Sequence, residues 1–206
     1  MSAPPDMRSG SAADRMVDPS AWIARTIAAD PRAMAQLSAV RDLGLSDWCI
    51  AAGFVRNRVW DVLHGHAPRR EPNDVDVLFF DPLDTGRARE AALQARLARA
   101  MPDAAWEVRN QARMHVAKAL PPHRGIAHAM TFWLETPTAV GLRLGADGAL
   151  SLVAPFGISD LAGLVCRPTP WGASRRDQYD ARIAAKRWRE TWPLLRFEEP
   201  RAQPRG

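Results

Sequence analysis

Two aspartates set one residue apart in an apolar segment constrain this 206-residue chain more than any other feature. Asp74 and Asp76 alternate with valines and run into Leu-Phe-Phe, while Pro72 and Asn73 break the chain just before them. This composition predicts a short strand that is buried on at least one face. Because side chains at positions i and i+2 of a strand point the same way, the two carboxylates share one face, with Cα atoms roughly 6.5–7 Å apart.

Carboxylates at this spacing predict a site for a cation. Each carboxylate raises the pKa of the other unless a positive charge lies between them. Mg²⁺ prefers oxygen ligands and is often held by one or two carboxylates together with substrate phosphates. A pair of such ions can stabilise both the attacking and the leaving oxygen of a phosphoryl displacement. The alternative is a solvated strand edge or a turn cap, in which Asn73 and Asp74 bond to the local backbone.

A glycine turn upstream favours the cation site. Residues 48–52 form a small apolar run, either a strand or the end of a helix, and residues 54–63 carry apolar positions at helical spacing. Gly53 therefore lies where the chain enters a helix. A glycine there lets backbone N–H groups approach a phosphate, and the helix dipole favours its negative charge. Arg56 and Arg58 are close enough in sequence to add charge-assisted hydrogen bonds.

The order of glycine turn, helix, loop and Asp-x-Asp strand resembles the polymerase-β nucleotidyltransferase superfamily. The local likeness is to the head domain of tRNA CCA-adding enzymes and poly(A) polymerases. Over roughly residues 30–195 the chain is similar to small bacterial nucleotidyltransferase-like proteins of unestablished function, through GFVRNRVWDVLHG, NDVDVLFFD, VRNQARMH, AVGLRL, APFGISDL and RPTP. The resemblance implies a mixed α/β (α+β) domain, with a central mixed sheet flanked by helices and a C-terminal helix.

The resemblance also implies an activity. A nucleoside monophosphate would pass from an NTP to an unknown acceptor hydroxyl on a small molecule, protein or RNA, with release of pyrophosphate. Asp74 and Asp76 are expected to be catalytic and to bind Mg²⁺ or Mn²⁺, and Glu107 is expected to complete the site. The expected nucleotide and phosphate contacts are Gly53, Arg56, Asn57 and Arg113, although Asn57 stands where the pattern has an aspartate. A buried hydrogen-bond network is the alternative role for the segment around Arg113.

Two departures favour a rival interpretation, a nucleotide-binding or regulatory module that keeps the fold without turnover. The usual Gly-Ser or Gly-Gly pair is Ala-Gly at residues 52–53. The third carboxylate of the superfamily is not obvious. Glu107 is the strongest candidate because Trp-Glu-Val starts a predicted strand, but a solvated strand residue is the alternative. Asp103 and Glu135 are weaker candidates.

The net charge of +5 comes from the C-terminal segment. Residues 1–166 carry 18 basic and 18 acidic side chains, whereas residues 167–206 carry 10 basic and 5 acidic ones. This segment would permit contact with RNA or DNA, and a third interpretation is an RNA-tailoring protein. A solvated surface is favoured, because no aromatic-studded RNA-binding motif accompanies the charge.

Composition also sets the expected organisation. Residues 1–19 are predicted to be a disordered leader, 20–195 the nucleotidyltransferase-like domain and 196–206 a flexible tail. The leader has no hydrophobic signal core and no apolar run is long enough to span a bilayer, so a cytoplasmic protein is expected. Helices are predicted within 22–43 as a pair, and over 54–63, 87–101, 127–134, 158–165 and 178–192, with a hairpin over 139–153.

Overall fold

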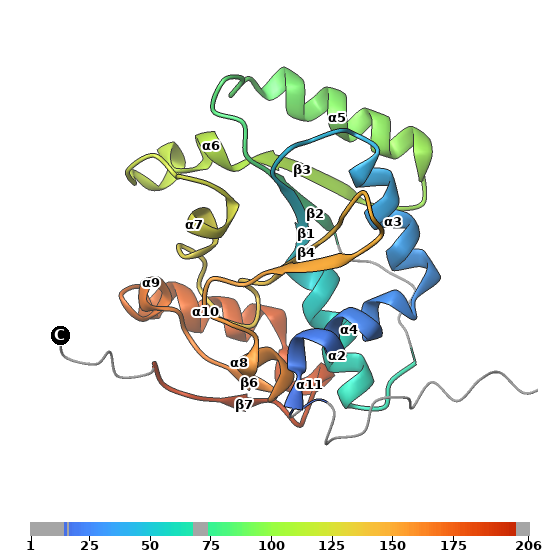
Figure 1. The fold of residues 1–206 in the computed structure, drawn as a ribbon. Helices are drawn as coiled ribbons and strands as arrows, with labels where there is room; N and C mark the ends of the chain where they lie inside the picture. Colours follow the sequence, from blue (N-terminus) through green and yellow to red (C-terminus); the bar gives the residue numbers. More distant parts are fainter. Residues whose placement is uncertain (1–14, 16, 68–73, 201–206) are drawn as a thin grey trace, which may run out of the picture.

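The computed structural model describes residues 15, 17–67 and 74–200. Its main sheet has the strand order β3-β2-β1-β4-β5, in which β2 and β3 are parallel and the other neighbours are antiparallel (Figure 1). The predicted central mixed sheet flanked by helices is confirmed. The strands are β1 (Trp48–Ala51), β2 (Val75–Phe79), β3 (Trp106–Asn110), β4 (Gly141–Leu144) and β5 (Leu150–Val153). A second, two-stranded parallel sheet joins β6 (Val165–Cys166) to β7 (Arg196–Phe197).

Helices cover both sides of the main sheet. They are α2 (Pro19–Ala28), α3 (Pro31–Arg41), α4 (Gly53–Leu63), α5 (Arg87–Ala100), α6 (Gln111–Met114), the 3₁₀ helix η1 (Val116–Lys118), α7 (Ile126–Met130), α8 (Ser159–Ala162), α9 (Pro170–Ala173), α10 (Arg176–Lys186) and α11 (Trp188–Thr191). No helix among these is long and apolar enough to cross a membrane, as far as the described chain goes.

The first two helices begin at the same local signal. Asp18 and Asp30 each precede a proline and cap the helix that follows, and the carboxylate of Asp30 accepts from the backbone N–H groups of Arg32 and Ala33. An aspartate cap followed by proline is a strong start signal, because proline needs no hydrogen-bond acceptor there and its φ suits a helix. The predicted pair of helices within residues 22–43 is confirmed.

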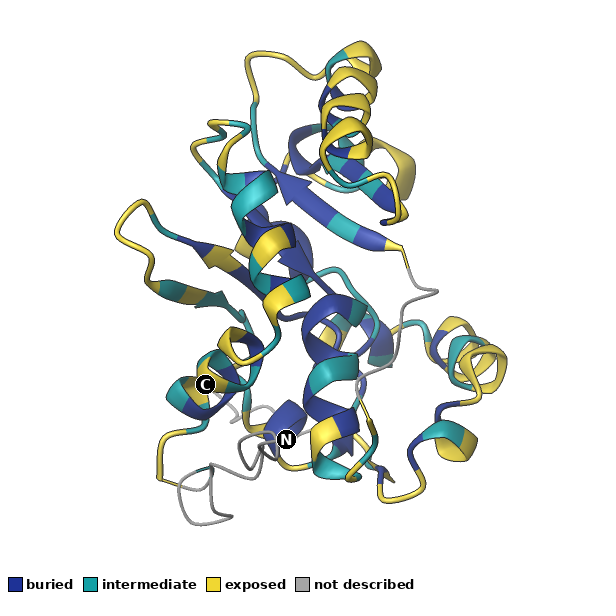
Figure 2. Cartoon of the chain, turned by 90° about the vertical axis from the view of Figure 1, so that its right-hand side faces the viewer, coloured by how far each residue is buried: buried dark blue, intermediate teal, exposed yellow. Residues whose placement is uncertain are grey.

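The two faces of β2 have different surroundings. Val75, Val77 and Phe79 point into the large core, which they share with residues of α2, α3, α4 and α5. Leu78 points to the other face and packs in a small cluster with residues of β1 and α7. The strands are therefore buried along much of their length, while the outer helix faces are exposed (Figure 2). Because strand side chains alternate, Asp74 and Asp76 lie on the same face as Leu78.

The C-terminal segment packs on α4. The rings of Trp188 and Trp192 meet Trp60 edge to face, with centroids 5.4 and 5.1 Å away. The indole N–H of Trp192 donates to the carboxylate of Asp61 at 2.8 Å. Strand β7 then pairs with β6, so residues 170–195 are held at both ends.

Three of the helices predicted from the sequence have different bounds in the structure. The helix predicted over 127–134 is α7, which ends at Met130 and continues as turns. The helix predicted over 158–165 is the short α8, followed by strand β6. The helix predicted over 178–192 is broken at Arg187, whose φ of 49° is left-handed, into α10 and α11. Packing of Trp188 against α4 accompanies this break and is not visible in local periodicity.

The structure describes only part of the segments that were predicted as a leader and a tail. Helix α2 starts at Pro19, within the segment predicted as a leader, and Arg196 and Phe197 form β7 within the segment predicted as a flexible tail. The remaining leader and tail positions 1–14, 16 and 201–206 lie outside the described residues. The three domain boundaries stay predictions.

Candidate active site

Asp74 and Asp76 open into a cleft with a volume of about 850 Å³. Its wall also includes Ala52 at the turn before α4 and side chains from residues 116–119, 132–138 and 171–186. The two carboxylates reach it because β2 turns its valines toward the large core and its aspartates toward the opposite face. The strand therefore brings together the pair that the sequence predicts.

The electrostatics of Asp76 are those of an uncompensated acid. Burial, followed by the nearby charges of Glu107 and Asp74, raises the pKa of Asp76 to about 6. The positive charges of Arg56 and Arg182 offset part of this shift. Neither Asp74 nor Asp76 forms an ion pair with any residue that the structure describes. A carboxylate in these surroundings gains from a cation that arrives with a ligand.

The turn between β1 and α4 has an unusual backbone at Ala52. Its φ of 55° and ψ of −122° form a conformation that suits glycine and strains a residue with a Cβ atom. At Gly53 an added Cβ would lie 3.3 Å from the side-chain nitrogen of Asn57 and 3.6 Å from Nη2 of Arg56. Gly53 therefore leaves room for the side chains of Arg56 and Asn57 at the start of α4, and Ala52 is the residue of the pair that lines the cleft.

Arg56 and Asn57 lie behind this turn. The guanidinium of Arg56 donates to Thr138 Oγ1 at 2.8 Å and to Asn57 Oδ1 at 3.0 and 3.2 Å, and it lies 4.4 Å from the ring centroid of Trp188. Burial lowers the pKa of Arg56 to about 10. Arg56 is buried and neither residue lines the cleft, so in this structure they support the turn.

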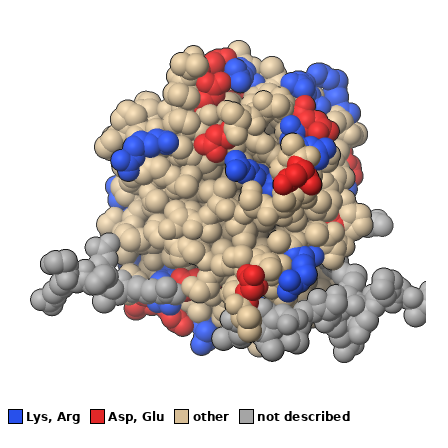
Figure 3. Space-filling model, in the orientation of Figure 1, with Lys and Arg blue, Asp and Glu red and all other residues tan. Residues whose placement is uncertain are grey.

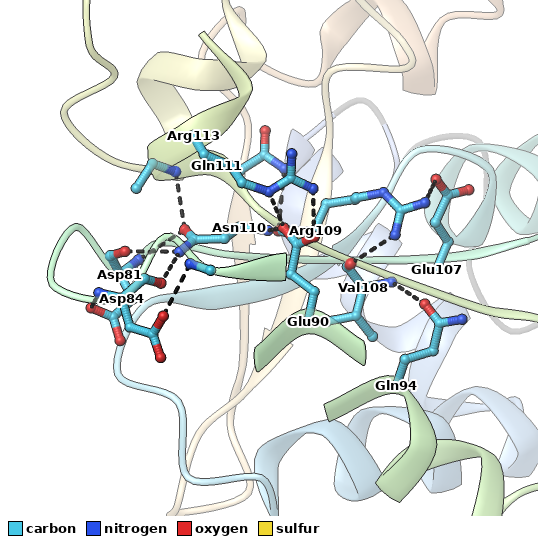
Figure 4. Close-up of polar contacts among 12 residues, drawn as sticks. Asp81, Asp84, Glu90, Gln94, Glu107, Val108, Arg109, Asn110, Gln111 and Arg113 are labelled. Carbon is cyan, nitrogen blue, oxygen red and sulfur yellow. Dashed lines mark hydrogen bonds and ion pairs between the residues drawn. The ribbon is translucent and has the colours of Figure 1, made fainter. Parts of the chain in front are cut away.

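Glu107 is the neighbour of Asp76 across the sheet. The two residues are register partners in the parallel pair β2 and β3, so their side chains lie on the same face. The carboxylate of Glu107 pairs with Arg109 at 2.8 Å (Figure 4). Asp103 pairs with Arg32 at 2.5 Å, and neither Glu107 nor Asp103 is part of the cleft wall. Of the three candidates for the third acid, Glu107 is thus the one beside Asp76 on the sheet, but an arginine engages it.

Glu135, the third candidate, lines the cleft. Its side chain is almost completely buried and pairs with Nε of Arg182 at 2.7 Å. Within the described ranges, no group of three or more histidine, cysteine, aspartate or glutamate side chains is arranged to hold a metal ion. The oxygen donors of Asp74 and Asp76 nevertheless suit a hard divalent cation whose remaining ligands are phosphate oxygens and water.

Arg113 lies in a separate network behind β3. Its guanidinium donates to both carboxylate oxygens of Glu90, at 2.8 and 2.5 Å, and Glu90 also accepts from the backbone N–H of Asn110 at 2.6 Å (Figure 4). Arg113 is not part of the cleft wall. The structure therefore places it in the buried hydrogen-bond network that was the alternative role for this segment.

Sequence reasoning missed most of the opposite wall. Lys118 from η1, Arg175 before α10, and Gln178, Arg182 and Lys186 from α10 all line the cleft. The last three are spaced four residues apart, which places them on one helix face. That spacing was readable in the sequence. The proximity of α10 to β2 was not, because nearly a hundred residues separate the two elements along the chain.

Comparisons with known proteins find a matching family and solved structures with a similar fold. A sequence profile of a family described as nucleotidyltransferase matches residues 38–197. A solved structure described as revealing a CCA-adding enzyme head domain is 35% identical, with a TM-score of 0.76, and the match covers 86% of this chain and 94% of that one. No curated protein matches the chain.

Two larger proteins share the fold at lower identity. A CCA-adding enzyme in complex with CTP is 17% identical with a TM-score of 0.56, and the match covers 86% of this chain and 43% of that one. A tRNA-processing enzyme complex is 19% identical with a TM-score of 0.52, over 79% of this chain and 43% of that one. The chain thus spans less than half the length of these two enzymes.

Proposed function

The chain belongs to a nucleotidyltransferase family, and on that premise we propose that it moves a nucleoside monophosphate from an NTP to an acceptor hydroxyl and releases pyrophosphate. The observation that carries this proposal is the pair Asp74 and Asp76. Both line the cleft, neither is neutralised by a described side chain, and burial among other acids raises the pKa of Asp76 to about 6.

In the proposed reaction, the acceptor oxygen bonds to the α-phosphorus as the bond from that phosphorus to the β-bridging oxygen breaks. Asp74 and Asp76 would hold Mg²⁺ or Mn²⁺, which would neutralise phosphate charge. The backbone of Ala52 and Gly53 would face the triphosphate at the start of α4. Glu107 would accept the hydroxyl proton, a role that requires its carboxylate to leave Arg109. Catalysis would rest on positioning and charge neutralisation.

The test is pyrophosphate release from each labelled NTP in the presence of Mg²⁺, with small-molecule and RNA fractions of a bacterial extract as acceptor sources. We expect release to fall on the order of 100-fold or more in Asp76→Asn. Asp147→Asn is the matched control, because Asp147 lies at the exposed tip between β4 and β5. Equal release by wild type and Asp76→Asn would refute the proposal.

Two observations favour the second candidate, a non-catalytic nucleotide-binding or regulatory module. Ala52 holds a glycine-type backbone conformation at the phosphate turn, and Glu107 is engaged by Arg109. This candidate predicts Mg²⁺-dependent binding of an NTP, lost in Asp76→Asn, without pyrophosphate release from any acceptor fraction. Increased turnover in Ala52→Gly would instead favour the enzyme.

A further inference from the structure

Half of the eight basic side chains between residues 167 and 200 are neutralised within the fold. Four arginines between residues 167 and 200 form ion pairs with acids: Arg167 with Asp160 and Glu198, Arg176 with Asp180 and Glu199, Arg182 with Glu135, and Arg187 with Glu190. Arg175 and Lys186 have no carboxylate partner in the part of the chain that the structure describes, and both line the cleft. Two of the basic side chains without a carboxylate partner, Arg175 and Lys186, are thus placed at the cleft.

Lys118 lines the same cleft as Arg175. Each of the two side chains is held by hydrogen bonds or ring contacts to uncharged groups. Lys118 Nζ donates to the backbone carbonyl of Phe132 at 2.8 Å. The guanidinium of Arg175 stacks on Trp171 with Cζ 3.0 Å from the ring centroid, and its Nη1 donates to Ser174 Oγ at 3.0 Å. Two cations therefore line the same cleft, and neither forms an ion pair with a carboxylate of the described residues.

The charge environment of Lys118 confirms this arrangement. Partial burial and the positive charge of Arg175 lower the pKa of Lys118, and no acid contributes to the shift. An anion bound between the two side chains would relieve their repulsion and accept hydrogen bonds from both. A group with two negative charges fits two unneutralised cations better than a carboxylate does.

The cation pair lines the same cleft as Asp74 and Asp76, at a different part of its wall. The groups that shift the pKa of Asp76 include Arg56 and Arg182, but neither Lys118 nor Arg175. The glycine turn, where a triphosphate would bind, lies at the aspartate end, because Ile50 pairs with Val77 in antiparallel β1 and β2 and the residues after Ile50 therefore lie beside Asp76. A volume of about 850 Å³ leaves room for a second ligand beside a nucleotide.

We propose that Lys118 and Arg175 bind a phosphate group of the acceptor, and that the acceptor is a small phosphate-bearing molecule whose hydroxyl reaches the aspartates. This assignment rests on the proposed nucleotidyl transfer. A small molecule fits better than RNA, because both cations line a cleft while four of the seven arginines between residues 167 and 200 form ion pairs. The face shown in Figure 3 carries basic and acidic side chains scattered over it, without a continuous basic track.

The experiment is calorimetric titration of inorganic phosphate into the full chain saturated with Mg²⁺ and a non-hydrolysable NTP analogue. We expect phosphate to bind this loaded protein, and Lys118→Gln and Arg175→Gln each to weaken it about tenfold, as expected for one charge-assisted hydrogen bond. Arg99→Gln is the control with the same charge change, because Arg99 is exposed on α5 and outside the cleft. Thermal unfolding of each variant verifies that it is folded.

The outcomes separate the two proposals. If the analogue does not bind, nucleotidyl transfer fails. If the analogue binds and then excludes phosphate, the cations hold the triphosphate and the acceptor assignment is wrong. Unchanged phosphate affinity in both glutamine variants would also overturn it. A short RNA that binds much more tightly than glycerol phosphate, with affinity falling steeply with salt, would replace the small molecule by RNA.

Discussion

Acidic side chains on the two sides of β3 differ in how their charge is balanced. Glu90, buried behind β3, accepts hydrogen bonds from the backbone of Asn110 and from two nitrogens of Arg113. Asp76, on the neighbouring strand, has no ion-pair partner among the described residues, and burial followed by the charges of Glu107 and Asp74 raises its pKa. Burial of an acid therefore does not mark a functional site in this protein. We propose that burial without an ion-pair partner does, because such a charge is left for a ligand to satisfy.

The strongest test of this contrast is Glu90→Ala. We expect a loss of about 3 kcal/mol in the free energy of unfolding, because Arg113 and the backbone N–H of Asn110 lose their shared partner. Urea unfolding followed by far-UV circular dichroism measures it. Glu190→Ala removes an exposed pair with Arg187 and is expected to change stability by less than about 1 kcal/mol. A similar decrease in the free energy of unfolding in both variants would show that the buried acid contributes no more to stability than the exposed one.

Removal of the Asp76 carboxylate is expected to raise the free energy of unfolding, whereas removal of the Glu90 carboxylate lowers it. A native pKa of about 6, above that of the unfolded chain, means that the native state binds the extra proton, so wild-type stability falls as pH rises from about 4 to 6. Asparagine does not ionise, so Asp76→Asn avoids this decrease in stability. At pH 7 its free energy of unfolding should exceed that of wild type by about 1–2 kcal/mol, after allowance for solvent screening. Near pH 4 the two proteins should be equally stable. Urea unfolding at the two pH values measures the difference, and destabilisation at pH 7 would contradict it.

The smallest expected effect is at the turn before α4. Ala52→Gly should stabilise the protein by about 0.5–1 kcal/mol, because glycine adopts a φ of 55° without strain, which outweighs its greater freedom in the unfolded chain. Ala91→Gly on the exposed face of α5 is the control and should lose about 1 kcal/mol. Thermal melts of both variants suffice. A loss at position 52 would show that the cleft does not rely on a strained turn.

Local signals explain which parts were predictable from the sequence. The strand at residues 75–79 and the helix from Gly53 were predictable because alternation, helical spacing and a glycine break are encoded within about ten residues. Glu107 is the neighbour of Asp76 only because β2 and β3 pair in parallel, and the spacing of the residues along the chain does not give that pairing.

The rest of the site depends on contacts between distant segments. Arg113 has the donors of a phosphate ligand, but its partner Glu90 lies 23 residues earlier on a helix packed behind the sheet. The break at Arg187 accompanies the packing of Trp188 on Trp60. The wall that contains Lys118 and Arg175 exists because the C-terminal helices fold back across the sheet. None of these contacts between distant segments produces a periodic pattern of residues in the sequence.

The pairing of β7 with β6 has a consequence for the order in which the site matures during synthesis. The aspartate strand and the glycine turn emerge from the ribosome within the first 80 residues, but α10 is held in place by β7 at residues 196–197. A nascent chain that has folded its main sheet but has not yet added β7 therefore displays two bare carboxylates to solvent, and the cleft wall is complete only after residues 196–197 have been made.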